Sequence, residues 1–269
     1  MKPLEAIRKK FGDYAPPIGL ILAFLLACQG TVVWRKVPEW ILPTPTEILK
    51  ATWQTLPLLT PHVLQTVQEM ALGLALALAA GVALAAMLDL STWLRRALYP
   101  LLVASQTIPI LALAPLLIIW FGFGIMPKVF IVALFGFFPI AINTADGLSA
   151  ADPELLSLLR AMGATRRQIW TKVRLPASLP YFFSGLRISA TYSVVGAIIG
   201  EWVGASQGLG IYMLRSANAF RTAQVFSAIA ISSLLSLTLF VAVFLIERML
   251  LPWYHSTQRA AQWEKSKIT

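Results

Sequence analysis

The sequence predicts an all-α, polytopic membrane protein with about six transmembrane helices and one cytoplasmic loop in which a glycine joins two short helices. Two observations predict this class. Hydrophobic residues make up 58% of the 269 residues and charged residues only 13%, whereas a typical soluble domain has ~25% charged residues. The apolar residues also gather in runs near the ~20 residues that a helix needs to cross a bilayer. We therefore expect residues 1–269 to form a single membrane domain with its core at 63–250.

The apolar runs predict where the chain crosses the membrane and which side each loop faces. Fifteen of the 22 lysines and arginines fall in segments on the side of the two termini, and six fall on the other side. Because basic residues are retained in the cytoplasm, both termini are expected to be cytoplasmic, and this bias also accounts for the net charge of +10. The predicted spans are residues 17–34, 63–88, 98–121, 125–145, 183–203 and 226–246.

The first span contains the only cysteine, Cys28, at the end of a Leu-Leu-Ala-Cys run. Such a run after basic residues is also typical of a lipoprotein cleavage site. Because the apolar run continues to Trp34 and is long enough to span, we interpret it as a transmembrane helix, with lipoprotein cleavage as the alternative. A single cysteine excludes an intrachain disulfide.

A helix start follows the first span. Thr44 is a suitable N-cap, Pro45 is suited to the first helical position, and Glu47 completes a capping box. We expect a short amphipathic helix on the outer surface, which serves packing or, as the alternative, contacts the substrate.

Small residues recur every four positions in the second and fifth spans, which marks faces where helices pack closely. The partner helix belongs either to the same chain, our default, or to a second copy. The residues are Gly73, Ala77, Gly81 and Ala85, and then Gly196, Gly200 and Gly204.

Prolines interrupt the third and fourth spans at Pro109, Pro115 and Pro139. Interior prolines kink a helix and free a backbone carbonyl, which is tolerated where neighbours or a water-lined cavity satisfy it. Prolines in two adjacent spans indicate a pathway.

Few ionisable residues fall within the spans, and none is evident at the midplane. Glu69, Lys128 and Asp146 are expected near the membrane surfaces. Glu201 lies in a glycine stripe ahead of a Gly204–Gly210 turn, so we consider it a gate or pathway residue, with a structural interfacial carboxylate as the alternative. Ion-driven transporters usually need charged groups at the midplane. Energy for transport is therefore expected to reach the bundle through the cytoplasmic loop.

That loop, at about residues 151–177, has clear helix signals. Asp152 is a good N-cap and Pro153 a good first residue, while Gly163 supplies the left-handed residue that ends a helix. Thr165 and Gln168 form a capping box for a second helix, which we expect to stop before Pro176. A basic hairpin with an apolar face predicts docking on a partner protein, and packing on its own bundle is the alternative. The face comprises Leu155, Leu159, Met162, Ile169, Trp170 and Val173.

The run from Ser157 through Gly163 to Leu175-Pro176 resembles the "EAA" loop of permeases from binding-protein-dependent ABC importers. Gly163 takes the seventh position and Pro176 the twentieth, whereas Ser157 replaces the glutamate of the family and Glu154 lies one turn earlier. The resemblance implies contact with an ATPase by Glu154, Ser157, Arg160, Ala161, Gly163, Ala164, Leu175 and Pro176.

Further segments at 42–47, 105–109, 114–116, 120–124, 138–139, 200–202 and 208–210 are similar to the branch that includes sulfonate, taurine and nitrate permeases. Within that branch, the chain looks most like permeases proposed for pyrimidine thiamine precursors or riboflavin, at Gln106, Asn143 and residues 137–139, 146–147 and 192–202. The candidates for pathway or gate are Gln106, Pro109, Pro139, Asn143 and Glu201.

The resemblance implies a permease subunit in a bacterial inner (plasma) membrane, working with a cytoplasmic ABC ATPase dimer, a second permease copy and an extracytoplasmic solute-binding protein. The chain itself is then no enzyme and binds no cofactor, metal or nucleic acid, since ATP and Mg²⁺ are used by the ATPase. Two alternatives remain open: an autonomous secondary transporter or channel, and a membrane scaffold that does not transport.

Overall fold

The computed structural model describes residues 2–254, with side chains from residue 15 on, and every regular element in this part of the chain is helical. Several basic residues that the topology prediction counts lie outside the described side chains. They are Lys2, Arg8, Lys9 and Lys10 at one end and Arg259, Lys265 and Lys267 at the other.

The helices follow one another with short connections. They are α1 (Lys2–Arg35), α2 (Pro45–Leu90), α3 (Thr92–Ser105), α4 (Ile110–Phe121), α5 (Met126–Ser149), α6 (Pro153–Ala161), α7 (Arg166–Ile169), the π-helix η1 (Trp170–Arg174), α8 (Leu175–Trp202), α9 (Leu209–Asn218) and α10 (Thr222–Leu250). Within the described residues, five helices are long and apolar enough to cross a membrane, or six if α3 and α4 form one broken span.

The chain divides into two compact units. The first comprises the residues up to Thr60 together with Tyr212–Ala230, and the second comprises Pro61–Ile211 together with the residues from Ile231. In the first unit, the Gln29 amide donates to the Thr46 hydroxyl at 3.2 Å, and the Thr222 hydroxyl donates to the Trp40 carbonyl at 2.6 Å.

The helix start at Thr44 is confirmed, but the helix is far longer than expected. The Glu47 N–H donates to Thr44 Oγ1 at 3.3 Å, and the Thr44 N–H donates to Glu47 Oε2 at 2.6 Å. The prediction of a separate short surface helix is wrong, because α2 continues for 46 residues. The helix continues because no glycine lies between residues 47 and 63 to end it, and because Pro57 and Pro61 remove only their own N–H donors.

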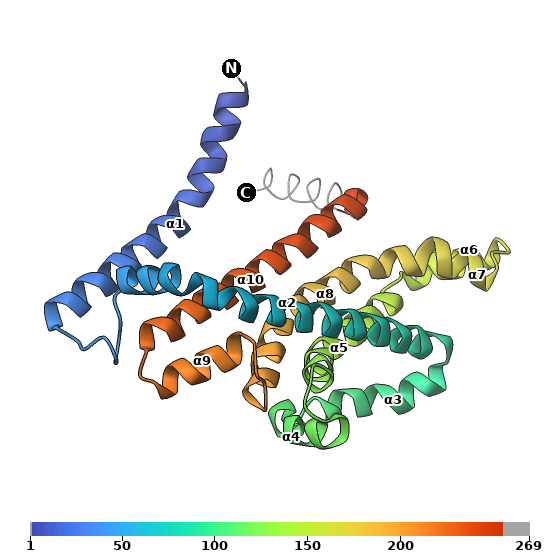
Figure 1. Ribbon diagram of the computed structural model, residues 1–269. Coiled ribbons are helices and arrows are strands. Elements are labelled where there is room, and N and C mark those ends of the chain that lie inside the picture. The colour runs from blue at the N-terminus through green and yellow to red at the C-terminus, as the bar shows by residue number, and fades with distance from the viewer. Residues whose placement is uncertain (1, 255–269) are drawn as a thin grey trace. The chain divides into compact units, whose positions relative to one another are not determined.

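The core of the second unit is the packing of α5 against α8, which run side by side (Figure 1). The glycine stripes lie at this and neighbouring crossings. A Cβ on Gly196 would lie 3.0 Å from the Val132 backbone, and one on Gly81 would lie 2.8 Å from the Ile140 side chain. The Ser189 hydroxyl donates to the Gly136 carbonyl at 2.6 Å. The stripes therefore serve packing within one chain, as our default interpretation had it.

The third predicted span is broken rather than kinked. Helices α3 and α4 meet at 98° across four residues, so the predicted interruption of the span over 98–121 at Pro109 is confirmed. Pro109 has no N–H to continue α3 and is the N-cap of α4. The Ser105 and Thr107 hydroxyls donate to the Leu102 and Ala104 carbonyls, at 2.8 and 2.7 Å, and so satisfy the end of α3.

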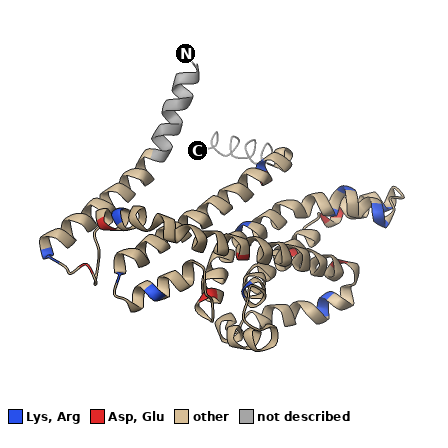
Figure 2. Cartoon of the chain, in the orientation of Figure 1, with Lys and Arg blue, Asp and Glu red and all other residues tan. Residues whose placement is uncertain are grey.

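Charged residues are sparse along the long helices. Figure 2 shows extended uncharged stretches, with lysines and arginines gathered at the α6–α7 hairpin and near helix ends. This distribution is typical of helices whose middles lie in lipid.

Candidate functional site

The hairpin between α5 and α8 begins as the sequence predicts. The Glu154 N–H donates to Asp152 Oδ1 at 2.8 Å, which caps α6. Gly163 ends α6 with a φ of +81°, and the Ala164 N–H donates a hydrogen bond to the Leu159 carbonyl at 2.9 Å. A left-handed residue at this position is the usual end of a helix.

The second helix starts as predicted but does not stop where predicted. The Gln168 N–H donates to Thr165 Oγ1 at 3.3 Å, and the Thr165 N–H donates to Gln168 Oε1 at 2.8 Å. The prediction that this helix ends before Pro176 is wrong, because α7 passes through η1 directly into α8. The Leu175 N–H bonds to the Trp170 carbonyl. This wider π turn accommodates the proline ring in the first turn of α8.

The two halves of the hairpin differ in exposure. Leu155 and Met162 in the first half are 42% and 74% exposed, whereas Ile169 in the second half is only 7% exposed. An open groove of about 340 Å³ lies between the halves and includes Leu159, Ile169 and Val173. The first half therefore offers an apolar surface, while the second half packs on the bundle.

The residues that the family resemblance assigns to the ATPase contact lie on this hairpin and at its return. Glu154, Ser157, Arg160, Ala161, Gly163 and Leu175 are exposed, and Ala164 and Pro176 are half-buried. The Ser157 hydroxyl donates to the Pro153 carbonyl of its own helix at 2.8 Å.

A buried ion pair ties the return of the hairpin to the bundle, and the sequence analysis missed it. Asp89, at the end of α2, contacts Arg174 Nη2 at 2.6 Å and Nη1 at 3.2 Å, and accepts from Trp170 Nε1 at 2.9 Å. Arg174 Nε also donates to the Leu148 carbonyl of α5 at 2.9 Å. We call Asp89, Trp170 and Arg174 the hairpin anchor. The sequence did offer one signal for this pair: Asp89 is a lone acidic residue at the point where the second span meets a loop with basic residues.

A more exposed pair joins α3 to α5 at the same end. Arg95 lies 3.3 Å from Asp146, and their side chains are 30% and 45% exposed. The Tyr99 hydroxyl donates to Asp146 at 3.3 Å, and Arg95 also donates to Ser149.

Glu201 lies in a buried polar cluster that joins α8, α2 and the start of α9. Its carboxylate accepts from the Thr66 hydroxyl at 2.6 Å and from the Gly210 N–H. The Leu209 N–H donates to Thr66 Oγ1 at 2.9 Å, and the Gly208 N–H donates to His62 Nδ1 at 3.0 Å. A side chain at Gly208 would collide with the carboxylate, which is why glycine is needed in this turn.

A second buried carboxylate, Glu69, completes the cluster. It lies 3.3 Å from Lys128 and accepts from the Gln65 amide at 2.8 Å. Glu69 and Glu201 are fully buried and Lys128 is 7% exposed. These three charged side chains are therefore enclosed by protein, which their expected place near a membrane surface did not indicate. Both Glu69 and Lys128 were expected near outer span ends, so their opposite charges could have suggested the pair.

The pathway candidates fall into separate places. Gln106 and Pro109 are exposed in the bend between α3 and α4. Pro139 and Asn143 lie together in α5, where the Asn143 amide donates to the Pro139 carbonyl at 2.8 Å. Among the hydrogen bonds and ion pairs described, none joins either pair to Glu201.

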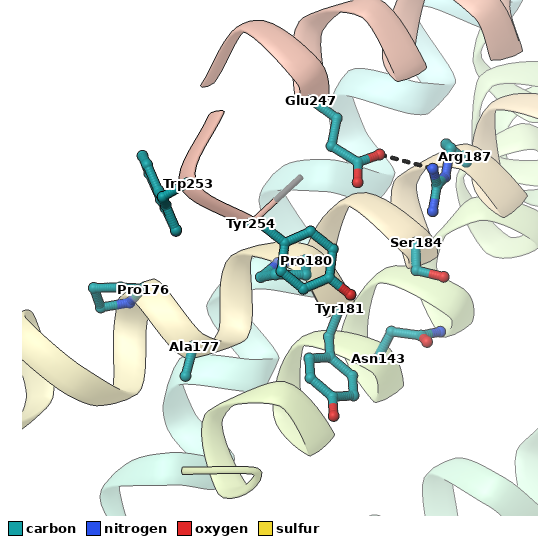
Figure 3. Close-up of a pocket in the computed structure, with 10 residues that line it drawn as sticks. All are labelled: Asn143, Pro176, Ala177, Pro180, Tyr181, Ser184, Arg187, Glu247, Trp253 and Tyr254. Atoms are coloured by element: carbon teal, nitrogen blue, oxygen red, sulfur yellow. Dashed lines mark ion pairs between the residues drawn. The ribbon is translucent and has the colours of Figure 1, made fainter. Parts of the chain in front are cut away.

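A cavity of about 700 Å³ lies at the hairpin end of the second unit (Figure 3). It brings Asn143 from the pathway candidates and Pro176 from the hairpin return to one space. Arg187 of α8 and Glu247 of α10 form an ion pair of 2.8 Å in its wall. The remaining lining residues are Ala177, Pro180, Tyr181, Ser184, Trp253 and Tyr254. In the part of the chain that the structure describes, no three His, Cys, Asp or Glu residues gather where they could hold a metal ion.

Comparison with known proteins adds to this geometry. Residues 73–255 match the family model described as "binding-protein-dependent transport system inner membrane component". The chain is 41% identical to a formylaminopyrimidine transport permease of Halalkalibacterium halodurans, over 82% of this chain and 91% of the relative. It is 37% identical to a riboflavin transport system permease of Chloroflexus aurantiacus, over 88% and 91% of the two chains. An inward-facing methionine ABC transporter chain matches with a TM-score of 0.64 and 21% identity, covering 73% of this chain and 97% of that one.

Proposed function

Because the chain belongs to the family of binding-protein-dependent transport system inner membrane components, we propose that it is the permease subunit of an ATP-driven ABC importer for a small organic solute. It provides the path through the membrane and carries out no catalysis. A cytoplasmic ATPase dimer supplies the energy, and an extracytoplasmic solute-binding protein delivers the solute. A second copy of the chain completes the membrane core.

One observation carries this proposal: the hairpin is exposed in its first half and fixed to the bundle in its second. The exposed helix α6 ends at the left-handed Gly163, so a partner has access to both. The hairpin anchor connects the return to α2 through Asp89 and to α5 through the Leu148 carbonyl. A displacement of the hairpin by an ATPase is thereby passed to three helices of the second unit, since α8 continues directly from η1.

The relatives favour a substrate class without fixing the compound. The two relatives described above are named for formylaminopyrimidine and riboflavin. Sulfonate-like solutes, which the wider branch includes, form the second class. The binding protein makes the first selection among these solutes, so the identity of the substrate depends on both proteins.

Replacement of Gly163 tests the coupling role. A Cβ at this position meets no atom within 4 Å, yet the φ of +81° disfavours any branched side chain. Gly163→Val should therefore leave the bundle folded but abolish transport and solute-stimulated ATP hydrolysis. Gly163→Asn is the matched control, since asparagine tolerates the left-handed conformation. Normal transport by Gly163→Val, at wild-type levels in the membrane, would contradict the proposal.

The buried polar cluster favours a second candidate, an ion-driven transporter, because buried carboxylates and lysines often carry coupling ions. Proteoliposomes that contain the chain alone separate the two candidates. Solute uptake driven by a proton or sodium gradient, without ATPase or ATP, would support the second candidate. Uptake only with the ATPase, ATP and the binding protein supports the first. A scaffold would copurify with the ATPase without solute-stimulated hydrolysis.

A further inference from the structure

We infer that the cavity of Figure 3 is a binding site for a neutral, planar, nitrogen-containing aromatic solute, at the end of the bundle that carries the hairpin. This inference rests on the function proposed above, because it names the class of solute that the permease handles. Two features of the cavity carry it: aromatic walls and a charge pair that neutralises itself.

The size and the walls of the cavity suit a ring compound. Its volume of about 700 Å³ falls in the range of ~300–1,000 Å³ that small-molecule sites occupy. Three aromatic residues, Tyr181, Trp253 and Tyr254, line it and are spread around the space in Figure 3. Tyr181 and Trp253 are 44% and 51% exposed, so their rings are accessible. Aromatic faces favour flat ligands through stacking.

The charged residues in the wall favour a neutral solute. Arg187 and Glu247 lie 2.8 Å apart, and the Glu247 side chain is only 3% exposed. An anion would have to displace Glu247 from the guanidinium and would then lie beside a carboxylate of the same charge. A sulfonate or nitrate site needs an uncompensated cation instead. The pair therefore disfavours these anions.

The polar groups of the cavity match a solute with both donors and acceptors. The Asn143 amide donates to the Pro139 carbonyl at 2.8 Å, which orients the side chain so that its oxygen is an acceptor. The hydroxyls of Ser184 and Tyr181 both donate and accept. Ring nitrogens and exocyclic amino or carbonyl groups present this combination, whereas a saturated hydrocarbon tail does not.

Equilibrium binding to the permease–ATPase complex in nanodiscs, without binding protein and without ATP, tests the inference. The probes are radiolabelled formylaminopyrimidine, riboflavin and butanesulfonate, and the ATPase alone gives the background. We expect saturable binding of one of the two aromatic probes and none of butanesulfonate at the same concentrations. Binding of neither aromatic probe, or equal binding of butanesulfonate, would overturn the inference.

Variants connect the binding to this cavity. Trp253→Ala should raise the Kd about tenfold, as the loss of one stacking partner does, and Ser184→Phe should abolish binding by filling the space. Trp93→Ala is the matched control, because Trp93 is 74% exposed on α3 and does not line the cavity. Glu247→Gln should permit butanesulfonate binding, since it leaves Arg187 uncompensated. Equal Kd values for Trp253→Ala and Trp93→Ala would refute the assignment of binding to this cavity. This comparison holds even if Ser184→Phe fails to fold.

Failure of this inference is distinguishable from failure of the proposed function. If the permease copurifies with its ATPase and transports with ATP, yet cavity variants bind like the wild type, only the cavity assignment is wrong. If the chain neither assembles with the ATPase nor depends on ATP, the proposed function itself is wrong.

Discussion

Asp89→Ala is the sharpest test of how hairpin motion reaches the membrane helices. Asp89 accepts from Trp170 and pairs with Arg174, and its side chain is only 5% exposed. The substitution removes the ion pair and the hydrogen bond by which Asp89 holds the return of the hairpin to α2, while the Arg174 bond to the Leu148 carbonyl of α5 remains. Residues 153–163, which we propose contact the ATPase, are untouched.

The expected loss of folding stability in Asp89→Ala follows from the burial of the Asp89–Arg174 pair. Removing one member of a buried ion pair costs ~3–5 kcal/mol, because the other charge is left uncompensated. The Arg174 side chain is 27% exposed, so water offsets part of that loss, and we expect a destabilisation of about 2–3 kcal/mol. A double-mutant cycle with Arg174→Ala should return a coupling energy of about 1–3 kcal/mol.

The functional measurement is the ratio of ATP hydrolysis stimulated by solute-loaded binding protein to basal hydrolysis, per assembled complex. For Asp89→Ala we expect this ratio to fall toward one, while copurification of the ATPase is retained. Asp146→Ala is the matched control, since its pair with Arg95 is more exposed and should cost less than about 1 kcal/mol. An unchanged ratio in an Asp89→Ala protein of the expected lower stability would refute the transmission argument.

Two further predictions concern the helix crossings of the second unit. Lys128→Met leaves the fully buried Glu69 without its counter-charge and should destabilise the permease by about 3–5 kcal/mol. Thermal unfolding in nanodiscs measures this loss of stability. Adding Glu69→Gln should restore most of the lost stability. Gly185→Ala places a methyl group against the Pro139 carbonyl and should cost about 1–3 kcal/mol. Gly19→Ala, with open space around it, should change stability by less than about 0.5 kcal/mol, and equal unfolding temperatures for these two variants would contradict the packing argument.

The local helix signals were predictable because each depends on neighbours in the sequence. The caps at Thr44, Asp152 and Thr165 and the left-handed Gly163 all involve atoms within a few residues of one another. Signals between neighbouring residues did not predict that α2 and α7 run on past prolines into longer helices. A proline is an expected helix end, yet Pro176 is accommodated by the π turn before it. That turn contains Arg174, which pairs with Asp89, 85 positions away in the sequence.

The buried pairs were harder to predict for a related reason. Hydropathy places a residue along a span but gives no rotation about the helix axis, so it does not say which charged side chains meet. Glu69 and Lys128 were expected near the same membrane surface, yet their contact depends on how α2 and α5 face each other. Glu201 stood out because of the glycines around it, and two of these, Gly208 and Gly210, leave room for its side chain.

The buried charges also bear on the choice between ATP-driven and ion-driven transport. Each of the principal pairs joins two different helices: Glu69 on α2 with Lys128 on α5, Asp89 on α2 with Arg174 on η1, and Arg187 on α8 with Glu247 on α10. Glu201 likewise has protein donors from Thr66 and Gly210. An ion-coupling site must exchange its partner for the ion in each cycle, whereas groups that are neutralised across a helix crossing fix the register of the two helices. We therefore infer that these charges connect helices so that a force applied at the hairpin displaces them together. The ATP-driven mechanism is favoured on this ground.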